Sequence, residues 1–476
     1  MAQNITATGT PGPNHVETYT IFPTNKYNRP PPPPSIPLHG LDTMAPPIHI
    51  LNHRFYHSPQ PGVTPSIIDK LKSSLAEALE LYAPISGTVR SDDNGDVYIA
   101  TDTENIQGTP FLVEMRDVPF AGDTEDLSPR TVVLLPPGSS TLAVKVTQFL
   151  CGTIAVAASI NHQVTDLRGF LDFLELWAQI ARGEAIAVTQ IPQDWSHTPG
   201  RFFSGLTGKS IVPIPPPGFA VLPVPATGAL AALLAPSKVT RWKFTKSAVE
   251  QLKTDFSPSV SSEAHKSGLW ISSGDALAAL LWGVITRARE NAHVSRLEGR
   301  STVESQTETL MMAADGRGRS PQGKMLYFGN FNPLFYTIAS RSDLLSLTYE
   351  SASRVALEIR NALNLQISPE AIADKISFYE DPKNAKPPGR ITWSGDVIMT
   401  NWCRFDLQCP KLDFGWGKPF SATAGAGGVY PPGYVMMTQE KDSGDIFILL
   451  TVEQQGAERM VADPLLNRYA SLIARG

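Results

Sequence analysis

The sequence of 476 residues contains little cysteine and little charge. Its three cysteines are an odd number and form no Cys-x-x-Cys pair, so neither a disulfide framework nor a zinc or iron–sulfur site is expected. Only 18% of the residues are charged, against a usual ~25%. Lys and Arg number 40 and Asp and Glu 45, which gives a net charge of −5 and excludes the basic stripe typical of nucleic-acid binding.

Long apolar runs are also missing. No stretch of about 18 apolar residues could span a membrane. The first 20 residues have neither the basic start nor the apolar segment of a signal peptide, and the C-terminal Ala-Arg-Gly is no peroxisomal or lipidation signal. The sequence therefore predicts a cytoplasmic, monomeric globular protein that binds neither nucleic acid nor membrane.

The sequence is instead rich in apolar residues and in proline. Apolar side chains make up 42% of the chain, and because single cores stop growing near ~250–300 residues, two domains are expected. Proline, with 41 residues, clusters at 30–34 and across 191–237. Five consecutive prolines favour a stiff polyproline II segment, and the second cluster shows neither helix nor strand periodicity. We predict a Pro-rich leader at 1–35, a first domain at 36–190, a crossover linker at 191–237 and a second domain at 238–476.

The strongest local motif follows an apolar strand predicted at 153–160. His162 lies in the polar turn after this strand, Asp166 stands four residues later, and an amphipathic helix runs from Leu167 to about Gly183. A strand, a turn and a helix in this order can expose a reactive side chain at the end of a sheet. His162 suits a general base that Asp166 holds in one tautomer, but the spacing also fits a structural histidine.

A second motif is the turn Asp413-Phe414-Gly415-Trp416-Gly417. Its two glycines allow positive φ angles and close backbone approach, and alone it could be an aromatic-anchored turn. Together, the His-x-x-x-Asp motif and the Asp-Phe-Gly-Trp-Gly motif far downstream of it resemble the BAHD family of coenzyme-A-dependent acyltransferases.

Further segments match this family, in the same order, across residues 20–470. They are Leu41-Asp42, Leu81 to Gly87, Ser273 to Leu277, Asp315 to Arg319, Tyr327 to Asn330, and Thr400-Asn401-Trp402. The match is similar in style to the fungal branch of trichothecene acetyltransferases. One departure is that plant members place Gly directly after the motif's Asp, whereas Leu167 stands here and Gly169 follows later. Condensation domains of peptide synthetases share the fold but carry two consecutive histidines, where this chain has Asn161 before His162.

The resemblance implies an α/β fold of two similar chloramphenicol-acetyltransferase-like domains with mixed sheets, and an active site in a channel between them. It implies acyl-CoA, with acetyl-CoA expected, as a co-substrate rather than a bound cofactor, and a small-molecule alcohol or amine as acceptor. His162 would remove the proton from a hydroxyl group of a specialised metabolite, whose oxygen attacks the thioester. Thr400 or Trp402 would donate a hydrogen bond to the oxyanion.

The two motif carboxylates each have a functional and a structural interpretation. Asp166 either orients His162 or turns away into an ion pair that shapes the turn. Asp413 is expected to pair with Arg317 or Arg319 and to hold the channel wall rather than to touch substrate.

The other candidate residues follow from the resemblance as well. Three would shape the site as structural residues: Gly415, Trp416 and Gly417. Three are candidates for contacts with the coenzyme A phosphates: Lys418, Arg404 and Ser272. Lys418 and Arg404 could equally well be solvated surface cations, and Ser272 could simply cap a helix.

Two further patterns are not expected to be sites. His49, His53 and His57 recur every fourth residue, but in a strand such residues lie ~13 Å apart, too far for one metal ion. Gly208-Lys209-Ser210 lacks the first glycine of a P-loop, because Phe203 stands there. Two alternative functions remain. The first is a cyclase or condensing enzyme that uses the same channel and base without acyl-CoA. The second is a non-catalytic scaffold, and the intact His162 and Asp413 motifs argue against it.

Overall fold

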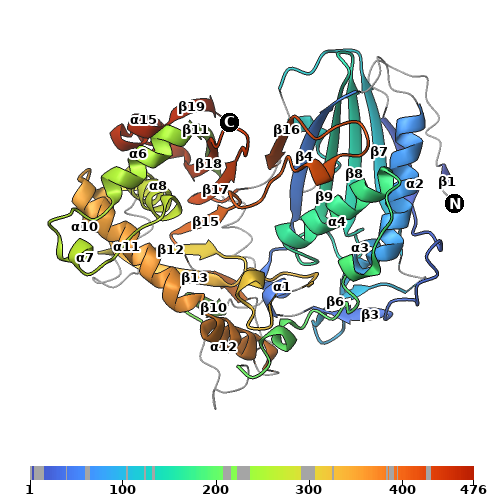
Figure 1. The fold of residues 1–476 in the computed structure, drawn as a ribbon, viewed down its shortest axis with the longest axis horizontal. Helices are drawn as coiled ribbons and strands as arrows, with labels where there is room; N and C mark the ends of the chain where they lie inside the picture. The colour runs from blue at the N-terminus through green and yellow to red at the C-terminus, as the bar shows by residue number, and fades with distance from the viewer. Residues whose placement is uncertain are drawn as a thin grey trace.

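A computed structural model describes residues 3–4, 16–38, 40–58, 65–102, 106–122, 125–130, 134–206, 216–221, 236–290, 306–323, 326–381, 384, 391–393, 395–424 and 430–475. Two seven-stranded mixed sheets lie side by side, each with helices packed on it (Figure 1). Among these residues no helix is long and apolar enough to cross a membrane.

The first sheet has the strand order β1-β2-β7-β8-β9-β4-β16, and its neighbours are antiparallel except β7 and β8. Its strands are β1 (Gln3–Asn4), β2 (Val16–Ile21), β4 (His49–His57), β7 (Thr109–Arg116), β8 (Leu142–Phe149), β9 (Thr153–Asn161) and β16 (Ser421–Ala424). Helices α2 (Pro65–Leu81) and α4 (Leu167–Ala181) pack against each other, and the Trp177 indole of α4 donates to the Leu71 carbonyl of α2. This packing fixes the turn between β9 and α4.

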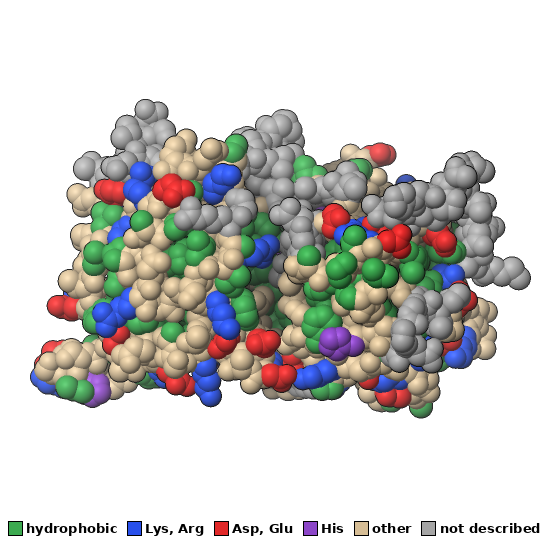
Figure 2. All heavy atoms as spheres, turned by 90° about the horizontal axis from the view of Figure 1, so that it is seen from above, with side chains coloured by type: hydrophobic (Ala, Val, Ile, Leu, Met, Phe, Trp, Pro, Cys, Tyr) green, Lys and Arg blue, Asp and Glu red, His purple; other side chains and the backbone are tan. Residues whose placement is uncertain are grey.

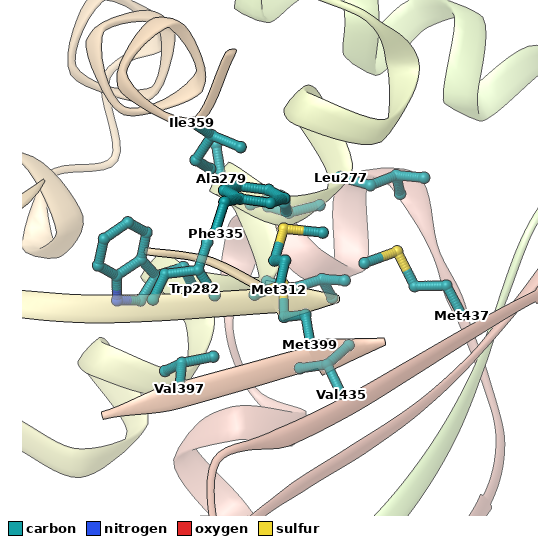
Figure 3. Packing of buried hydrophobic residues seen from close by; sticks show 14 of the residues in the cluster. Leu277, Ala279, Trp282, Met312, Phe335, Ile359, Val397, Met399, Val435 and Met437 are labelled. Carbon is teal, nitrogen blue, oxygen red and sulfur yellow. The ribbon is translucent and has the colours of Figure 1, made fainter. Parts of the chain in front are cut away.

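The second sheet has the order β13-β12-β15-β17-β18-β11-β19, with β12, β15 and β17 parallel to one another. Its strands are β11 (Ser237–Phe244), β12 (Thr307–Ala313), β13 (Leu334–Ser340), β15 (Val397–Asn401), β17 (Tyr434–Gln439), β18 (Ile446–Glu453) and β19 (Ser471–Arg475). Helices α6 (Lys246–Phe256), α8 (Ser273–Arg289) and α11 (Tyr349–Gln366) pack on it. Leu277 and Trp282 of α8 lie over Met312 and Val397 of the sheet in its core (Figure 3).

The remaining helices and strands lie outside the two large sheets. The helices are α1 (Gly40–Met44), α3 (Ala83–Ser86), α7 (Glu263–Lys266), α10 (Arg341–Leu345), α12 (Pro369–Glu380), α14 (Ala457–Val461) and α15 (Pro464–Tyr469). Two small sheets are formed by β3 (Ser35–Pro37), β6 (Val97–Ala100) and β5 (Thr88–Ser91), and by β10 (Phe219–Val221) and β14 (Ile391–Trp393).

The predicted α/β class with mixed sheets is confirmed, but the chain crosses the predicted domain boundaries. Residues 16–21 form β2 and pair with β7, so the prediction of a leader outside the first domain is wrong for this segment. In the other direction, β16 from the C-terminal half pairs with β4 and completes the first sheet. Much of the predicted linker, residues 207–215 and 222–235, lies outside the described residues, as does the Gly208-Lys209-Ser210 pattern.

Candidate active site

His162 is fixed through its backbone at the end of β9. All nine residues of β9 are buried between β8 and β4, as expected for a strand that is apolar almost throughout. The His162 amide donates to the Ile48 carbonyl (2.8 Å), and the Asn330 side-chain amide donates to the His162 carbonyl (2.8 Å). The imidazole Nδ1 is buried and has no hydrogen-bond partner among the described residues. The backbone that carries the imidazole is therefore held in place from two sides.

The His162 side chain lines a cavity of about 40 Å³, which has room for roughly two or three water molecules. Its walls come from both halves of the chain, namely from α1, β12, α12, the linker segment 216–218 and the segment 332–334. The other lining residues are Leu41, Met44, Ala45, Pro46, Pro216, Pro217, Gly218, Met311, Asn332, Pro333, Leu334, Lys375 and Tyr379. Because most of these side chains are apolar, the cavity shields a reacting group from water.

Asp166 does not contact the imidazole but caps α4 and pairs with the other half of the chain. Its carboxylate accepts two hydrogen bonds from the Arg317 guanidinium (2.8 and 3.0 Å) and one each from the backbone amides of Gly169 (3.1 Å) and Phe331 (2.8 Å). Both side chains of the ion pair are buried. The ion pair that the structural interpretation expected is formed, and it fastens the turn after His162 to the segment around Phe331.

The charges of these groups follow from burial and pairing. Burial lowers the pKa of His162 below its ordinary 6.5, against smaller opposing contributions from its own backbone, the Asp166 carboxylate and Asn330. Burial alone would raise the pKa of Asp166, but the charge and hydrogen bonds of Arg317 outweigh it and hold this pKa below its ordinary value. The site at neutral pH therefore contains a neutral imidazole beside an ionised, fully paired carboxylate, which is the protonation state that a general base needs.

A second buried network supports the backbone of His162. Asp42 in α1 accepts hydrogen bonds from the amide (2.7 Å) and the side chain (3.0 Å) of Asn330, and Nδ1 of His197 lies 3.0 Å from its other carboxylate oxygen. The side chains of Asp42 and His197 are fully buried. Gly329, at φ 142°, lies so close to this network that an added Cβ would be 3.1 Å from His197 Nδ1. Hydrogen bonds thus link Asp42 of α1, His197 of the predicted linker and Asn330, whose side chain also binds the His162 carbonyl.

The Asp413 turn is built differently from the prediction. The expected ion pair of Asp413 with Arg317 or Arg319 does not form. Instead one carboxylate oxygen of Asp413 accepts from the backbone amides of Gly415 (2.6 Å), Trp416 (2.9 Å) and Gly417 (2.8 Å). An aspartate two residues before a glycine at φ 104° finds these amides in its own turn.

The aromatic rings of this turn anchor it on the first sheet. Phe414 and Trp416 stack on each other with centroids 5.7 Å apart, and both contact Tyr56 of β4 edge-on. Phe414 also meets the Trp177 ring of α4 at 4.7 Å. None of these side chains lines the cavity of His162. The turn therefore supports the first sheet and its helices, at a distance from the cavity.

The candidates for phosphate contacts have separate surroundings. Ser272 is the N-cap of α8 and forms a capping box with Asp275. Lys418 is exposed and pairs with Asp442 at 2.8 Å. Arg404 is exposed and lies near enough to Arg319 for its charge to lower the pKa of Arg319, which burial already lowers.

Two predicted oxyanion donors lie at the end of β15. Thr400 is the fourth residue of this strand, and Trp402 follows it with its amide bonded to the Met437 carbonyl (2.8 Å). Neither is among the residues that line the cavity of His162.

Sequence reasoning missed three residues that this geometry brings to His162. Asn330 and Asp42 occurred only as parts of matched segments, and Lys375 gave no signal at all. The side chains of Asp42 and Asn330 are polar and fully buried. Because buried polar groups need hydrogen-bond partners, a prediction that both are buried could have suggested that they contact each other. Lys375 had no comparable signal, because a single lysine in an amphipathic helix is ordinary.

A second, larger groove of about 1,090 Å³ lies along α4 and the segments 315–323 and 326–328. Its charges are of both signs and pair with each other, as Arg168 does with Asp172 (2.6 Å) and Lys411 with Glu175 (3.7 Å). Charges of both signs are also interspersed over the face drawn in Figure 2. The groove thus has no excess of either charge that would select an ionic ligand.

Comparisons with known proteins identify the family and the fold of the chain. A sequence profile of the Transferase family matches residues 14–463. The chain is 26% identical to hydroxycinnamoyl-CoA:5-hydroxyanthranilate N-hydroxycinnamoyltransferase HHT4 of Avena sativa, over 89% of this chain and 94% of that protein. It is also 26% identical to acyltransferase uat1 of Mycosarcoma maydis, over 88% of this chain and 86% of that protein. The solved structure of F. sporotrichioides TRI101 complexed with coenzyme A and T-2 shares the fold, with a TM-score of 0.69, 18% identity, and coverage of 92% of this chain and 100% of that chain.

Proposed function

Because this chain belongs to the Transferase family, the BAHD acyltransferases, it is an enzyme that transfers acyl groups, and we propose that it transfers an acetyl group from acetyl-CoA to a hydroxyl group of a specialised metabolite. One observation carries the proposal. His162 lines an apolar cavity between the two halves of the chain, and its neutral imidazole has a buried Nδ1 without a hydrogen-bond partner among the described residues.

The reaction needs one proton carrier. The His162 imidazole removes the proton from the acceptor hydroxyl, and the oxygen attacks the thioester carbonyl carbon to form a tetrahedral oxyanion. The carbon–sulfur bond then breaks, and the imidazolium returns its proton to the thiolate of coenzyme A. General acid–base catalysis of this kind contributes about 10²–10⁴ to the rate, and a donor to the oxyanion, for which Thr400 and Trp402 are the candidates, contributes about 10²–10³.

The donor end of the site is proposed near the N-terminus of α8. Arg360 donates to Asp275 of this helix (2.8 Å), and its charge, like that of Arg404, lowers the pKa of Arg319 after the larger effect of burial. Three guanidinium groups therefore lie near one another, and among them Arg319 and Arg404 suit the phosphates of coenzyme A. Arg360 is paired with Asp275 and Lys418 with Asp442, so these two are weaker candidates.

The proposal is tested by measuring free thiol and product mass together. The purified protein is incubated with acetyl-CoA and a metabolite extract, in parallel with a heat-inactivated sample. The expected result is release of one thiol for each product molecule that has gained one acetyl group. Formation of a product without thiol release would instead support a cyclase or condensing enzyme that uses the same base.

A further inference from the structure

Helix α12 places a lysine, Lys375, in the wall of the His162 cavity. Its residue is only 6% exposed. Among the described residues that line the cavity, Lys375 is the one Lys, Arg, Asp or Glu, and burial keeps His162 neutral at physiological pH. The surrounding wall is mostly apolar, as Leu41, Met44 and Met311 illustrate. The cavity thus combines a neutral imidazole, an amine that can be protonated and an apolar wall.

The ammonium group of Lys375 has carbonyl partners but no carboxylate. Its Nζ donates to the carbonyls of Leu334 and of Gln366, the latter at 2.7 Å. No Asp or Glu among the described residues lies within 4.0 Å of it. An ammonium has three N–H donors, so these two bonds leave one donor unassigned.

Other buried cations of the second half are neutralised. Arg289 pairs with Glu453 at 2.8 Å, and Arg341 pairs with Glu308 at 2.6 Å. A buried charge is costly unless it is paired, and this cost is visible in the pKa of Lys375, which burial lowers from 10.5 to about 7. A fold that needed only two hydrogen bonds to carbonyls could use a neutral amide here. At a pKa of about 7 the lysine is only partly protonated at neutral pH, and a bound carboxylate would stabilise its protonated form.

We propose that Lys375 binds the carboxylate of an acidic acceptor, so that the acceptor is a small hydroxy acid. Its hydroxyl group would lie at His162 and its carboxylate at Lys375, with the apolar part of the molecule against Met44 and Met311. The small volume of the cavity favours a compact acceptor over a large polycyclic one. The inference rests on the proposed function, because it takes His162 as the group that receives the hydroxyl.

Binding of a probe anion tests the inference without requiring turnover. Acetate and acetamide have the same shape but differ in charge, and both are small enough for the cavity. Their binding is measured by calorimetry on four proteins: wild type, Lys375→Arg, Lys375→Gln and the exposed control Lys253→Gln. Gln keeps a donor for the two carbonyls without the charge, and thermal melts confirm that each variant is folded. We expect acetate to bind wild type, Lys375→Arg and Lys253→Gln, and to bind Lys375→Gln about ten- to a hundredfold more weakly. Acetamide should bind all four alike.

Two results would overturn the inference: equal binding of acetate to wild type and Lys375→Gln, or no binding of acetate to the wild type at millimolar concentration. The His162→Ala variant separates this outcome from the fate of the proposed function. If His162→Ala still binds acetate but also still releases thiol at the wild-type rate, the base assignment fails while the anion site stands. If His162→Ala releases no thiol and Lys375→Gln binds acetate as tightly as wild type does, the base assignment stands and the acidic acceptor is wrong.

Discussion

The two motif turns use an aspartate in opposite ways. Asp166 is buried and accepts hydrogen bonds from Arg317 and Phe331, which belong to the other half of the chain. Asp413 is only half-buried and accepts three hydrogen bonds from amides of its own turn. The first carboxylate therefore joins two segments that are far apart in sequence, and the second stabilises a local turn. Motif residues of the same type can thus carry very different energetic weight.

Arg317→Ala tests the contribution of the buried Asp166–Arg317 ion pair and should have the largest effect on stability. It leaves Asp166 buried and without its counter-ion, which costs about 3–5 kcal/mol. Urea unfolding of wild type and variant measures the loss, and thiol release should fall with it because the turn after His162 loses its anchor. The matched control is Arg354→Ala, which breaks an exposed pair with Asp343 and should cost about 0–1 kcal/mol. Equal losses of unfolding free energy in the two variants would contradict the claim that the Asp166–Arg317 pair stabilises the fold more than an exposed ion pair does.

Substitutions of Asp413 test the contribution of the hydrogen bonds within its own turn. Asn keeps an oxygen that can accept the three amides, so Asp413→Asn should fold and release thiol nearly as wild type does. Asp413→Ala leaves those amides without an acceptor and should lose about 1–3 kcal/mol of stability. Chemical unfolding and thiol release per folded molecule measure both effects. A folded but inactive Asp413→Asn protein would show that Asp413 takes part in the reaction.

Local patterns explain which parts could be predicted. The apolar run of β9, the turn and the amphipathic α4 are encoded within residues 153–181, and each appears as predicted. The predicted ion pair of Asp413 was wrong because its carboxylate accepts hydrogen bonds from the amides of its own glycine-containing turn. These amides are closer in sequence than any arginine of the other motif. The leader was wrong at 16–21 because the surrounding prolines conceal a short strand whose partner, β7, lies about 90 residues away.

Features assembled from distant segments could not be predicted. The cavity walls come from five separate parts of the chain, and no single part carries a pattern that marks it. Pairing of β16 with β4 joins residues 421–424 to residues 52–55, across the predicted domain boundary. Such contacts depend on the finished packing of both sheets rather than on propensity.

The pH dependence of the reaction gives a smaller effect with a definite sign. His162, the proposed base, can accept a proton only when neutral, and burial lowers its pKa below 6.5. With an uncharged acceptor, so that Lys375 has no ionic partner, kcat/KM should be nearly constant from pH 7 upward. It should fall as the pH drops through the lowered pKa of His162, with a midpoint below 6.5. A midpoint above 7 would mean that the imidazole is stabilised in its charged form and that the site is not as desolvated as its geometry indicates.

The most direct test of the account is thiol release by His162→Ala, compared with the exposed control His265→Ala in α7. Both variants should melt close to the wild-type temperature, since Nδ1 of His162 makes no hydrogen bond within the described residues. The account predicts that His162→Ala loses about 10²–10⁴ in kcat while His265→Ala retains full activity. A folded His162→Ala protein that releases thiol at the wild-type rate would contradict it.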